Sequence, residues 1–299
     1  MDTTTIPDSC PADAARPLLA QPRHVLRLSE GLPTSDGAGV KLTRLIGTPR
    51  QPPVDPFLML DAFGTDQPQD YIAGFPPHPH RGFETVTYML KGLMRHRDNH
   101  GGEGLLVPGS VQWMTAGRGI VHSEMPEQQE GRMRGFQLWV NLPATEKMTA
   151  PRYQEYGPER FPEAEPLPGV RVKVIAGRVG EVLGAISQPA TEPTYLDVRL
   201  APGARFAHAV PADHTAFAYV YEGSARFGEG QETAAVESQE LAVFGPGERI
   251  VVEGHDAGAC LILVAGRPLR EPVARYGPFV MNTQAELRQA FEDFQAGRF

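Results

Sequence analysis

Two short segments each place a pair of potential metal ligands at positions i and i+2. The first pair is His78 and His80, which flank a proline, and the second pair is His122 and Glu124. On an extended strand, residues i and i+2 point to the same face. Two such pairs on neighbouring strands would direct three imidazoles and one carboxylate at one point. This donor set suits a divalent transition metal and leaves coordination positions open for a substrate.

A single His-x-His pair is a weak indication, because pairs of surface histidines are common. The second pair strengthens it, because the roughly forty residues between the two correspond to three or four short strands, enough for the chain to return beside its start. Pro79 lacks a backbone donor and therefore favours an edge or bulged strand, as at the mouth of a barrel. We expect His78, His80 and His122 to bind a metal, and neutral imidazoles suit Fe, Cu, Ni or Zn.

The fourth ligand has two candidates. Glu84 shares strand parity with His80, and Glu124 shares parity with His122, so an unbroken strand would point either carboxylate inward. Spacing alone does not choose between them. The carboxylate that is not a ligand is expected to orient a histidine or to take a substrate proton, so both are candidate catalytic residues.

The remaining candidates are weaker. His96 and His100 flank a predicted turn, and His24 and His255 are expected on the surface. Four large side chains are expected in the core, although they could also line an apolar pocket for a flat ligand: Trp113, Met114, Met125 and Phe136.

Length and composition limit the class of protein. A chain of 299 residues favours two domains, and its 32 glycines and 29 prolines favour turns and short strands. The net charge of −8, with no basic run, argues against direct nucleic-acid binding. Two cysteines indicate no disulfide framework, and the sequence contains neither a signal-like apolar segment nor a membrane-spanning run. We therefore expect a cytoplasmic protein without a membrane partner, and a monomer.

The order of segments predicts the architecture. Residues 1–21 resemble a flexible leader, short β-like runs follow, and residues 144–168 form a Pro- and Glu-rich interdomain connection. A helix is predicted over 283–296, because Thr283 and Glu286 fit a capping box and apolar residues recur at helical spacing. Strands are expected at 83–90, 136–141, 170–176, 195–200, 217–221, 241–244, 250–252 and 260–264.

The two halves of the chain resemble a worn repeat, which predicts a duplicated barrel. Residues 87–92 resemble 218–223, and residues 105–109 resemble 241–247. Offsets counted from these segments place four residues at the second-copy positions of the ligands: Ala209, Pro211, Cys260 and Ile262. We therefore expect a metal-binding domain at 22–150, a second domain without metal ligands at 151–299, and one metal per chain.

Four longer runs carry a family resemblance: 75–88, 111–126, 136–143 and 276–283. They resemble the pirin family within the cupin superfamily. The resemblance implies an all-β bicupin, that is, two tandem cupin β-barrels with a C-terminal helix. It also implies a metal in the N-terminal domain on His78, His80, His122 and Glu124. General cupins instead use the glutamate four residues after the second histidine, here Glu84, so the resemblance favours Glu124 as the ligand.

The same resemblance implies a function. Bacterial pirins resemble quercetin 2,3-dioxygenases, which open the central ring of a flavonol with O₂. The expected cofactor is Fe(II), with Cu, Mn, Ni, Co or Zn as alternatives, and the expected substrate is a small flavonol-like aromatic molecule. The alternative is a non-enzymatic, iron-binding regulator that acts through a protein partner, as eukaryotic pirins resemble transcription cofactors. A purely structural metal site is disfavoured, because such sites are usually closed.

Overall fold

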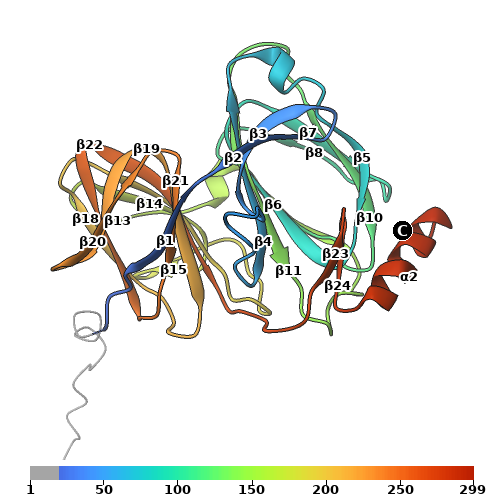
Figure 1. Cartoon of the computed structure of the whole chain (residues 1–299). Helices are drawn as coiled ribbons and strands as arrows, with labels where there is room; N and C mark the ends of the chain where they lie inside the picture. Colours follow the sequence, from blue (N-terminus) through green and yellow to red (C-terminus); the bar gives the residue numbers. More distant parts are fainter. Residues whose placement is uncertain (1–19) are drawn as a thin grey trace, which may run out of the picture.

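The computed structural model describes residues 20–299, which form two β-barrels lying side by side (Figure 1). Strands between residues 32 and 156 build the first barrel, and strands between residues 163 and 266 build most of the second. The described part of the chain contains one α-helix, α2. The predicted all-β architecture of two barrels with a C-terminal helix is therefore confirmed.

Two sheets close the first barrel. The larger contains, in spatial order, β12 (Arg152–Tyr156), β9 (Val111–Thr115), β6 (Phe83–Lys91), β11 (Met133–Asn141), β4 (Phe57–Thr65), β3 (Val40–Ile46) and β2 (Leu32–Asp36). The smaller contains β5 (Phe75–His80), β10 (Ile120–Pro126), β7 (Met94–Asp98) and β8 (Glu103–Leu106). Short 3₁₀ helices lie at Pro68–Asp70 and Pro158–Arg160.

One nine-stranded sheet forms the second barrel. Its main order is β1 (Val25–Glu30), β21 (Glu240–Phe244), β19 (Thr215–Glu229), β22 (Arg249–Gly266), β17 (Thr194–Leu200), β14 (Val170–Ala176) and β13 (Glu163–Leu167). Two more strands pair at its side, β18 (Arg205–Ala209) on β22 and β20 (Glu232–Glu237) on β19. Two small hairpins complete the strands: β15 (Arg178–Val179) with β16 (Val182–Leu183), and β23 (Ala274–Tyr276) with β24 (Phe279–Met281).

The two barrels share an aromatic interface. The Phe136 ring of the first barrel lies 5.9 Å from the Tyr219 ring and 5.5 Å from the Tyr221 ring of the second. The hydroxyls of Tyr88 and Tyr221 donate to the buried Asp197 carboxylate at 2.7 and 2.5 Å. Because apolar side chains from both barrels are buried in one cluster, the barrels have a common core as well as their own.

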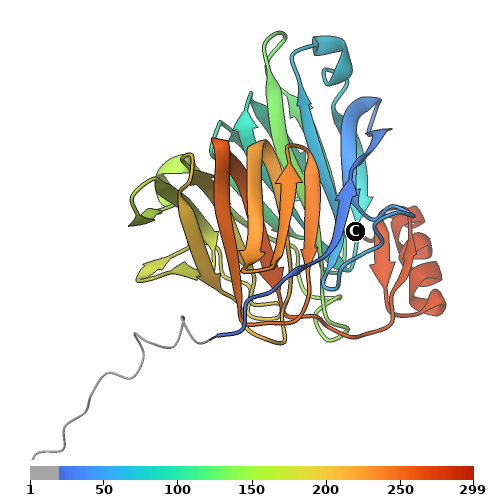
Figure 2. The same cartoon turned by 60° about the vertical axis from the view of Figure 1, so that its left-hand side comes forward.

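The N-terminal end of the described chain packs on the second barrel, and the C-terminal end packs on the first. The first strand, β1, pairs with β21 of the second barrel. After β22 the chain returns, so that β23, β24 and α2 lie against the first barrel in both views (Figures 1 and 2). The predicted domain boundaries 22–150 and 151–299 therefore do not coincide with the sheets. Local composition does not indicate these pairings, because they join segments that are far apart in the chain.

The predicted connection at 144–168 also needs correction. It contains β12, which pairs with β9 of the first barrel, and β13, which pairs with β14 of the second. The crossing between barrels is therefore confined to the few residues around the 3₁₀ helix at Pro158–Arg160. The leader predicted at 1–21 lies outside the described residues except for its last two. Of these, Ala20 already accepts a 2.7 Å hydrogen bond from Arg249 through its carbonyl oxygen.

The helix α2 (Gln284–Gln295) forms where the sequence predicted a helix, and it begins with the predicted capping box. The Thr283 side chain accepts from the Glu286 backbone N–H, and the Glu286 carboxylate accepts from the Thr283 N–H, which completes the capping box. The helix buries Leu287 and Ala290 against the β23–β24 hairpin. Among residues 20–299, no helix has the length and apolar character needed to cross a membrane.

Candidate metal centre

The two histidine-bearing segments form neighbouring antiparallel strands. In the pairing of β5 with β10, His78 lies directly opposite His122, and His80 lies opposite Ile120. β5 is the edge strand of its sheet, as expected for a strand that contains Pro79. The register shifts between His122 and Glu124, so Glu124 lies opposite Phe75.

This pairing brings three imidazoles together. Ring centroids are separated by 4.7 Å for His78 and His80, 4.5 Å for His78 and His122, and 5.0 Å for His80 and His122. One ring nitrogen from each residue can be chosen so that all three lie within 4.8 Å of one another. Nitrogens this close can converge on a single ion, so the geometry agrees with the expected histidine set.

The hydrogen bonding of the rings also suits a metal. Both nitrogens of His122 and Nδ1 of His80 are buried without a hydrogen-bond partner among the described residues. Buried polar atoms without partners are unfavourable, and a bound cation would satisfy them. Nδ1 of His78 lies 2.8 Å from the Pro76 carbonyl oxygen, a contact that leaves its Nε2 free for a ligand bond.

Burial sets the protonation state of two of these rings. It lowers the pKa of His80 and His122 well below the ordinary value, and the neighbouring imidazoles lower it further. Both rings are therefore neutral near pH 7, which is the form that binds a metal.

Glu124 lies at the same site but outside the compact group of imidazoles. It is buried and lines one cavity together with His78 and His80. The Thr87 hydroxyl lies 2.9 Å from its Oε1, and Gln137 Nε2 lies 3.5 Å from its Oε2. Burial raises the pKa of Glu124, and His78 opposes this shift. The structure thus places Glu124 beside the imidazoles, and its role as fourth ligand remains a prediction.

Glu84 points elsewhere. Its carboxylate accepts hydrogen bonds from Thr115 at 2.6 Å and from Gln188 of the second barrel at 2.5 Å. Burial raises its pKa, and these hydrogen bonds oppose the shift. The expectation that Glu84 would face the same point as His80 is wrong, because Gly82 (φ +85°) turns the chain between β5 and β6. Parity extends only along an unbroken strand.

A buried arginine supports the strand that carries His80. Arg81 donates through Nε to the Arg118 carbonyl at 2.5 Å and through Nη1 to Asp293 of α2 at 2.7 Å. Its guanidinium also stacks on the Phe299 ring at 4.3 Å. Arg81 therefore links the end of the strand that carries His80 to the C-terminal helix.

A buried lysine, Lys147, supports the turn that follows His80. Lys147 Nζ donates to the carbonyls of Gly82 and Val280 at 2.7 and 3.1 Å and to Asn141 Oδ1 at 2.7 Å. It joins the turn after His80 to β24. Sequence reasoning did not identify Arg81, Asp293 or Lys147, because the contacts that join them to the opposite end of the chain, Arg81 to Asp293 and Lys147 to Val280, leave no local pattern.

A cavity of about 600 Å³ opens onto the imidazoles. Much of its wall is apolar and aromatic, with side chains from both sheets of the first barrel: Leu42, Met59, Phe63, Phe75, Met94 and Trp139. The charged wall residues are Asp36, Arg44, Asp61, Glu124 and Arg275. Trp113, Met114 and Phe136 are buried core residues, as expected, and are not part of this wall.

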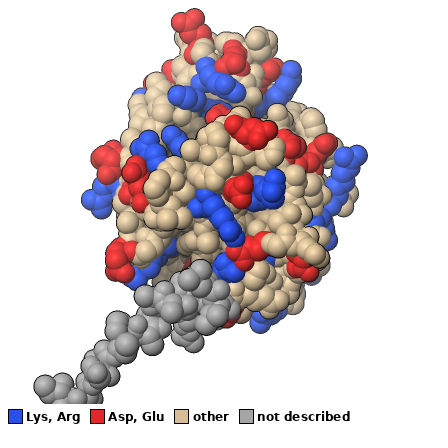
Figure 3. Space-filling view, turned by 90° about the vertical axis from the view of Figure 1, so that its left-hand side faces the viewer, with Lys and Arg blue, Asp and Glu red and all other residues tan. Residues whose placement is uncertain are grey.

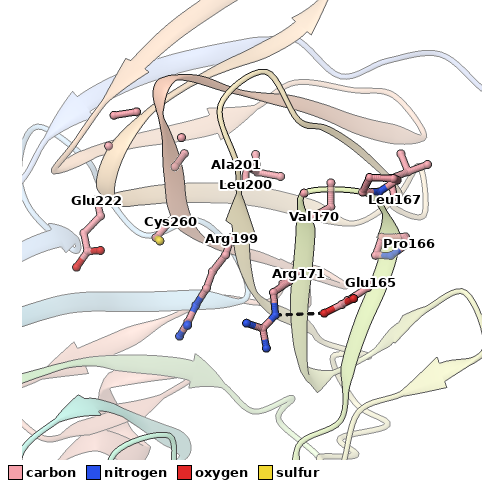
Figure 4. A pocket seen from close by; sticks show the side chains of 16 residues that line it. Glu165, Pro166, Leu167, Val170, Arg171, Arg199, Leu200, Ala201, Glu222 and Cys260 are labelled. Atoms are coloured by element: carbon pink, nitrogen blue, oxygen red, sulfur yellow. Dashed lines mark ion pairs between the residues drawn. The ribbon is translucent and has the colours of Figure 1, made fainter.

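A larger hollow, of about 830 Å³, lies on the second barrel (Figure 4). Arg171, Arg199 and Cys260 are neighbours across adjacent strands in its wall, and Arg171 pairs with Glu165. Within residues 20–299, only His78, His80 and His122 form a group of three or more metal-competent side chains. The chemistry is therefore assigned to the smaller cavity.

The second barrel has its own counterparts of the ligand strands. β18 pairs with β22 as β5 pairs with β10, and their inward residues Phe206, His208, Ile250 and Val252 are buried. The offset-derived equivalents Ala209, Pro211, Cys260 and Ile262 are therefore wrong. Cys260 and Ile262 lie further along β22, opposite β17. Gly109 precedes β9, the strand before β10, whereas Gly247 follows β21, the strand before β22, so offsets counted from these two glycines do not start at corresponding turns.

The outer face of the second barrel shows no region of a single charge sign. On the side drawn in Figure 3, Lys and Arg alternate with Asp and Glu over the surface.

Comparison with known families identifies the family to which the chain belongs. The family profile described as Pirin matches residues 39–140, and the one described as the Pirin C-terminal cupin domain matches residues 195–299. The chain belongs to the pirin family. Its two barrels are accordingly cupin domains, and the resemblance drawn from the four sequence runs is confirmed.

Relatives of this pirin-family chain span nearly its whole length. A Pseudomonas aeruginosa protein named "Putative quercetin 2,3-dioxygenase" is 52% identical over 284 residues, which are 92% of this chain and 97% of that one. Human Pirin is 46% identical over 265 residues, 87% and 88% of the two chains. A crystal structure of quercetin 2,3-dioxygenase from Acinetobacter baumannii superposes with a TM-score of 0.82 at 31% identity, covering 93% and 98%.

Proposed function

We propose that this protein is a metal-dependent dioxygenase of the pirin type, which opens the central ring of quercetin-like flavonols with O₂. The observation that carries the proposal is the group of three imidazoles at the base of an aromatic-walled cavity. The names of the Pseudomonas and Acinetobacter proteins support the reaction class.

The donor set fits one divalent transition metal per chain. His78, His80 and His122 would hold it through imidazole nitrogens, with Glu124 as the fourth ligand, and Fe(II) is the metal we expect. Such an ion would supply Lewis-acid and redox chemistry toward O₂ at the coordination positions that the protein leaves open. The orphaned nitrogens of His80 and His122 support this assignment independently of the comparisons.

The protein side chains would bind and orient the substrate. The aromatic and methionine walls suit a flat, multi-ring molecule and exclude bulk water from the reacting end. Glu124 is the candidate to take the proton of a substrate hydroxyl, because it lines the cavity together with His78 and His80. Thr87 and Gln137 hold its carboxylate in place.

Turnover tests the proposal directly. Protein loaded separately with Fe, Mn, Co, Ni or Cu is mixed with quercetin, and loss of the flavonol absorbance is followed together with O₂ uptake. We expect matched consumption of flavonol and O₂ with at least one metal, and none with His122→Ala treated in the same way. Absence of consumption with every metal would overturn the proposal and favour the non-enzymatic regulator.

A further inference from the structure

We propose that Arg275 is a specificity residue, which binds an anionic group of an aromatic ligand in the cavity that also contains His78 and His80. The inference rests on the proposed function, and it names a class of substrate: flat aromatic molecules that chelate the metal at one end and carry a carboxylate or similar anion at the other. The placement of Arg275, its lack of an anionic partner and the charge of the cavity support it.

The fold brings Arg275 to the site from the far end of the chain. It lies on β23, where it pairs with Val280 of β24, and this hairpin packs on the first barrel after the chain has left the second. Gly277 and Pro278, in the turn of the hairpin, line the same cavity. Lys147 and Arg81 anchor the hairpin through Val280 and Pro278, so the position of Arg275 is well determined.

Trp139 connects the guanidinium with the histidine group. The Arg275 guanidinium carbon lies 4.7 Å from the centre of the Trp139 ring, and that ring lies 5.2 Å from the His80 ring. These two distances limit the separation of the guanidinium and the His80 ring to about 10 Å. A molecule of two or three fused or linked rings is long enough to reach from the histidine group to the guanidinium along the aromatic wall.

Arg275 differs from the other arginine of the cavity in its partners. Arg44 forms a bidentate pair with Asp61 at 2.8 and 2.7 Å and also contacts Asp36 at 2.9 Å. Arg275 has only long contacts, to the Leu58 carbonyl at 3.4 Å and to the Met59 sulfur at 3.8 Å. Burial lowers the pKa of Arg275 and the nearby Asp61 and Asp36 oppose this shift, but their direct ion pairs within residues 20–299 are with Arg44 and not with Arg275. A half-buried guanidinium with such weak partners is a ready donor for a ligand anion.

The charge balance of the cavity favours the same ligand. The wall contains three carboxylates (Asp36, Asp61 and Glu124) and two guanidiniums (Arg44 and Arg275). With a divalent metal the formal total is one positive charge. A ligand that carries one negative charge therefore neutralises the site.

The test compares two ligands of the same shape. Protein loaded with Fe(II) is titrated under nitrogen with 3-hydroxyflavone-4′-carboxylate and with the neutral 4′-carboxamide, and each dissociation constant is read from the change in flavonol absorbance. We expect the carboxylate to bind about tenfold more tightly or better, as a charge-assisted hydrogen bond allows. Arg275→Gln should abolish this preference and change carboxamide binding less than about threefold. Arg275→Lys should retain part of the preference.

The control is Arg288→Gln, which removes an exposed cation of α2 in the same C-terminal segment. It should bind both ligands as the unaltered protein does. The inference is overturned if the unaltered protein shows no preference, if Arg275→Gln keeps it, or if that variant weakens both ligands equally. An Arg275-dependent preference without O₂ consumption by any flavonol would overturn the dioxygenase proposal alone. Flavonol turnover with a preference independent of Arg275 would overturn this inference alone.

Discussion

We expect Lys147 to make the stability of the first barrel depend on pH. Its side chain is 1% exposed, and burial lowers its pKa from 10.5 to about 8, against the opposing influence of Glu271 and Glu286. In the unfolded chain the amine regains its ordinary pKa. Between these two values the unfolded state binds more protons than the folded state, so the free energy of unfolding increases with pH.

The size of the effect follows from the shift. A lowering of about 2.5 pKa units corresponds to a penalty of about 3 kcal/mol, which is fully present below about pH 8. The penalty is relieved as the pH rises from about 8 toward 10.5. Between about pH 7 and pH 9.5, the relief amounts to about 2 kcal/mol.

Substitution with methionine isolates this contribution. Lys147→Met removes the titrating group, and it also leaves the oxygens of Gly82, Val280 and Asn141 without their donor. The lost hydrogen bonds produce an offset that does not vary with pH. The difference in unfolding free energy between the unaltered protein and the variant should therefore move in favour of the unaltered protein by about 2 kcal/mol over this range.

Urea unfolding followed by tryptophan fluorescence measures the difference. Both tryptophans, Trp113 and Trp139, lie in strands of the first barrel, so the signal reports on the domain that contains Lys147. Groups common to the two proteins, including the site histidines, cancel in the comparison. Lys91→Met, at an exposed lysine, is the control and should run parallel to the unaltered protein. A constant difference for Lys147→Met from pH 7 to 9.5, or a trend of the opposite sign, would refute the reasoning.

Three further outcomes are expected. His80→Ala should lose bound metal, measured by elemental analysis, while its circular dichroism stays unchanged, because the barrel has its own core; retained stoichiometric metal contradicts this. Glu124→Gln should weaken metal binding, whereas Glu84→Gln should leave metal content full and lower stability by about 1 kcal/mol; the reverse pattern would restore Glu84 as ligand. Asp293→Asn should destabilise the first barrel by about 2 kcal/mol in urea unfolding, because Arg81 loses its carboxylate partner. The control Asp256→Asn, at an exposed position, should not change the stability. Equal effects of the two substitutions would contradict a stabilising role of the Arg81–Asp293 pair.

The placement of the histidines shows how far local patterns reach. The spacing within each pair needs only the two-residue period of a strand, and Pro79 indicates an edge strand by its missing donor. The observed pairing of His78 with His122 follows once the two strands are neighbours. The capping box at Thr283 is similarly local, since all its atoms lie within one helical turn.

Glu84 marks the limit of the same reasoning. Parity with His80 would hold only along one strand, whereas the turn at Gly82 ends β5 and Glu84 lies on β6, which belongs to the other sheet. The repeat alignment failed because Gly109 and Gly247, from which the offsets were counted, lie in different turns of the two barrels, one before β9 and the other after β21.

The sequence by itself determined the duplicated β architecture, the C-terminal helix, the family and the three histidines expected to bind a metal. All of these depend on periodicity, turn chemistry or motifs contained in short segments. Only the tertiary structure decided that β1 packs on the second barrel and α2 on the first, that Glu84 bonds to Gln188 of the second barrel, and where Arg81, Lys147 and Arg275 lie relative to the imidazoles. Their partners are Asp293, Val280 and Trp139, more than a hundred residues away in each case. Contacts between such distant residues depend on how whole sheets pack, and no local spacing records them.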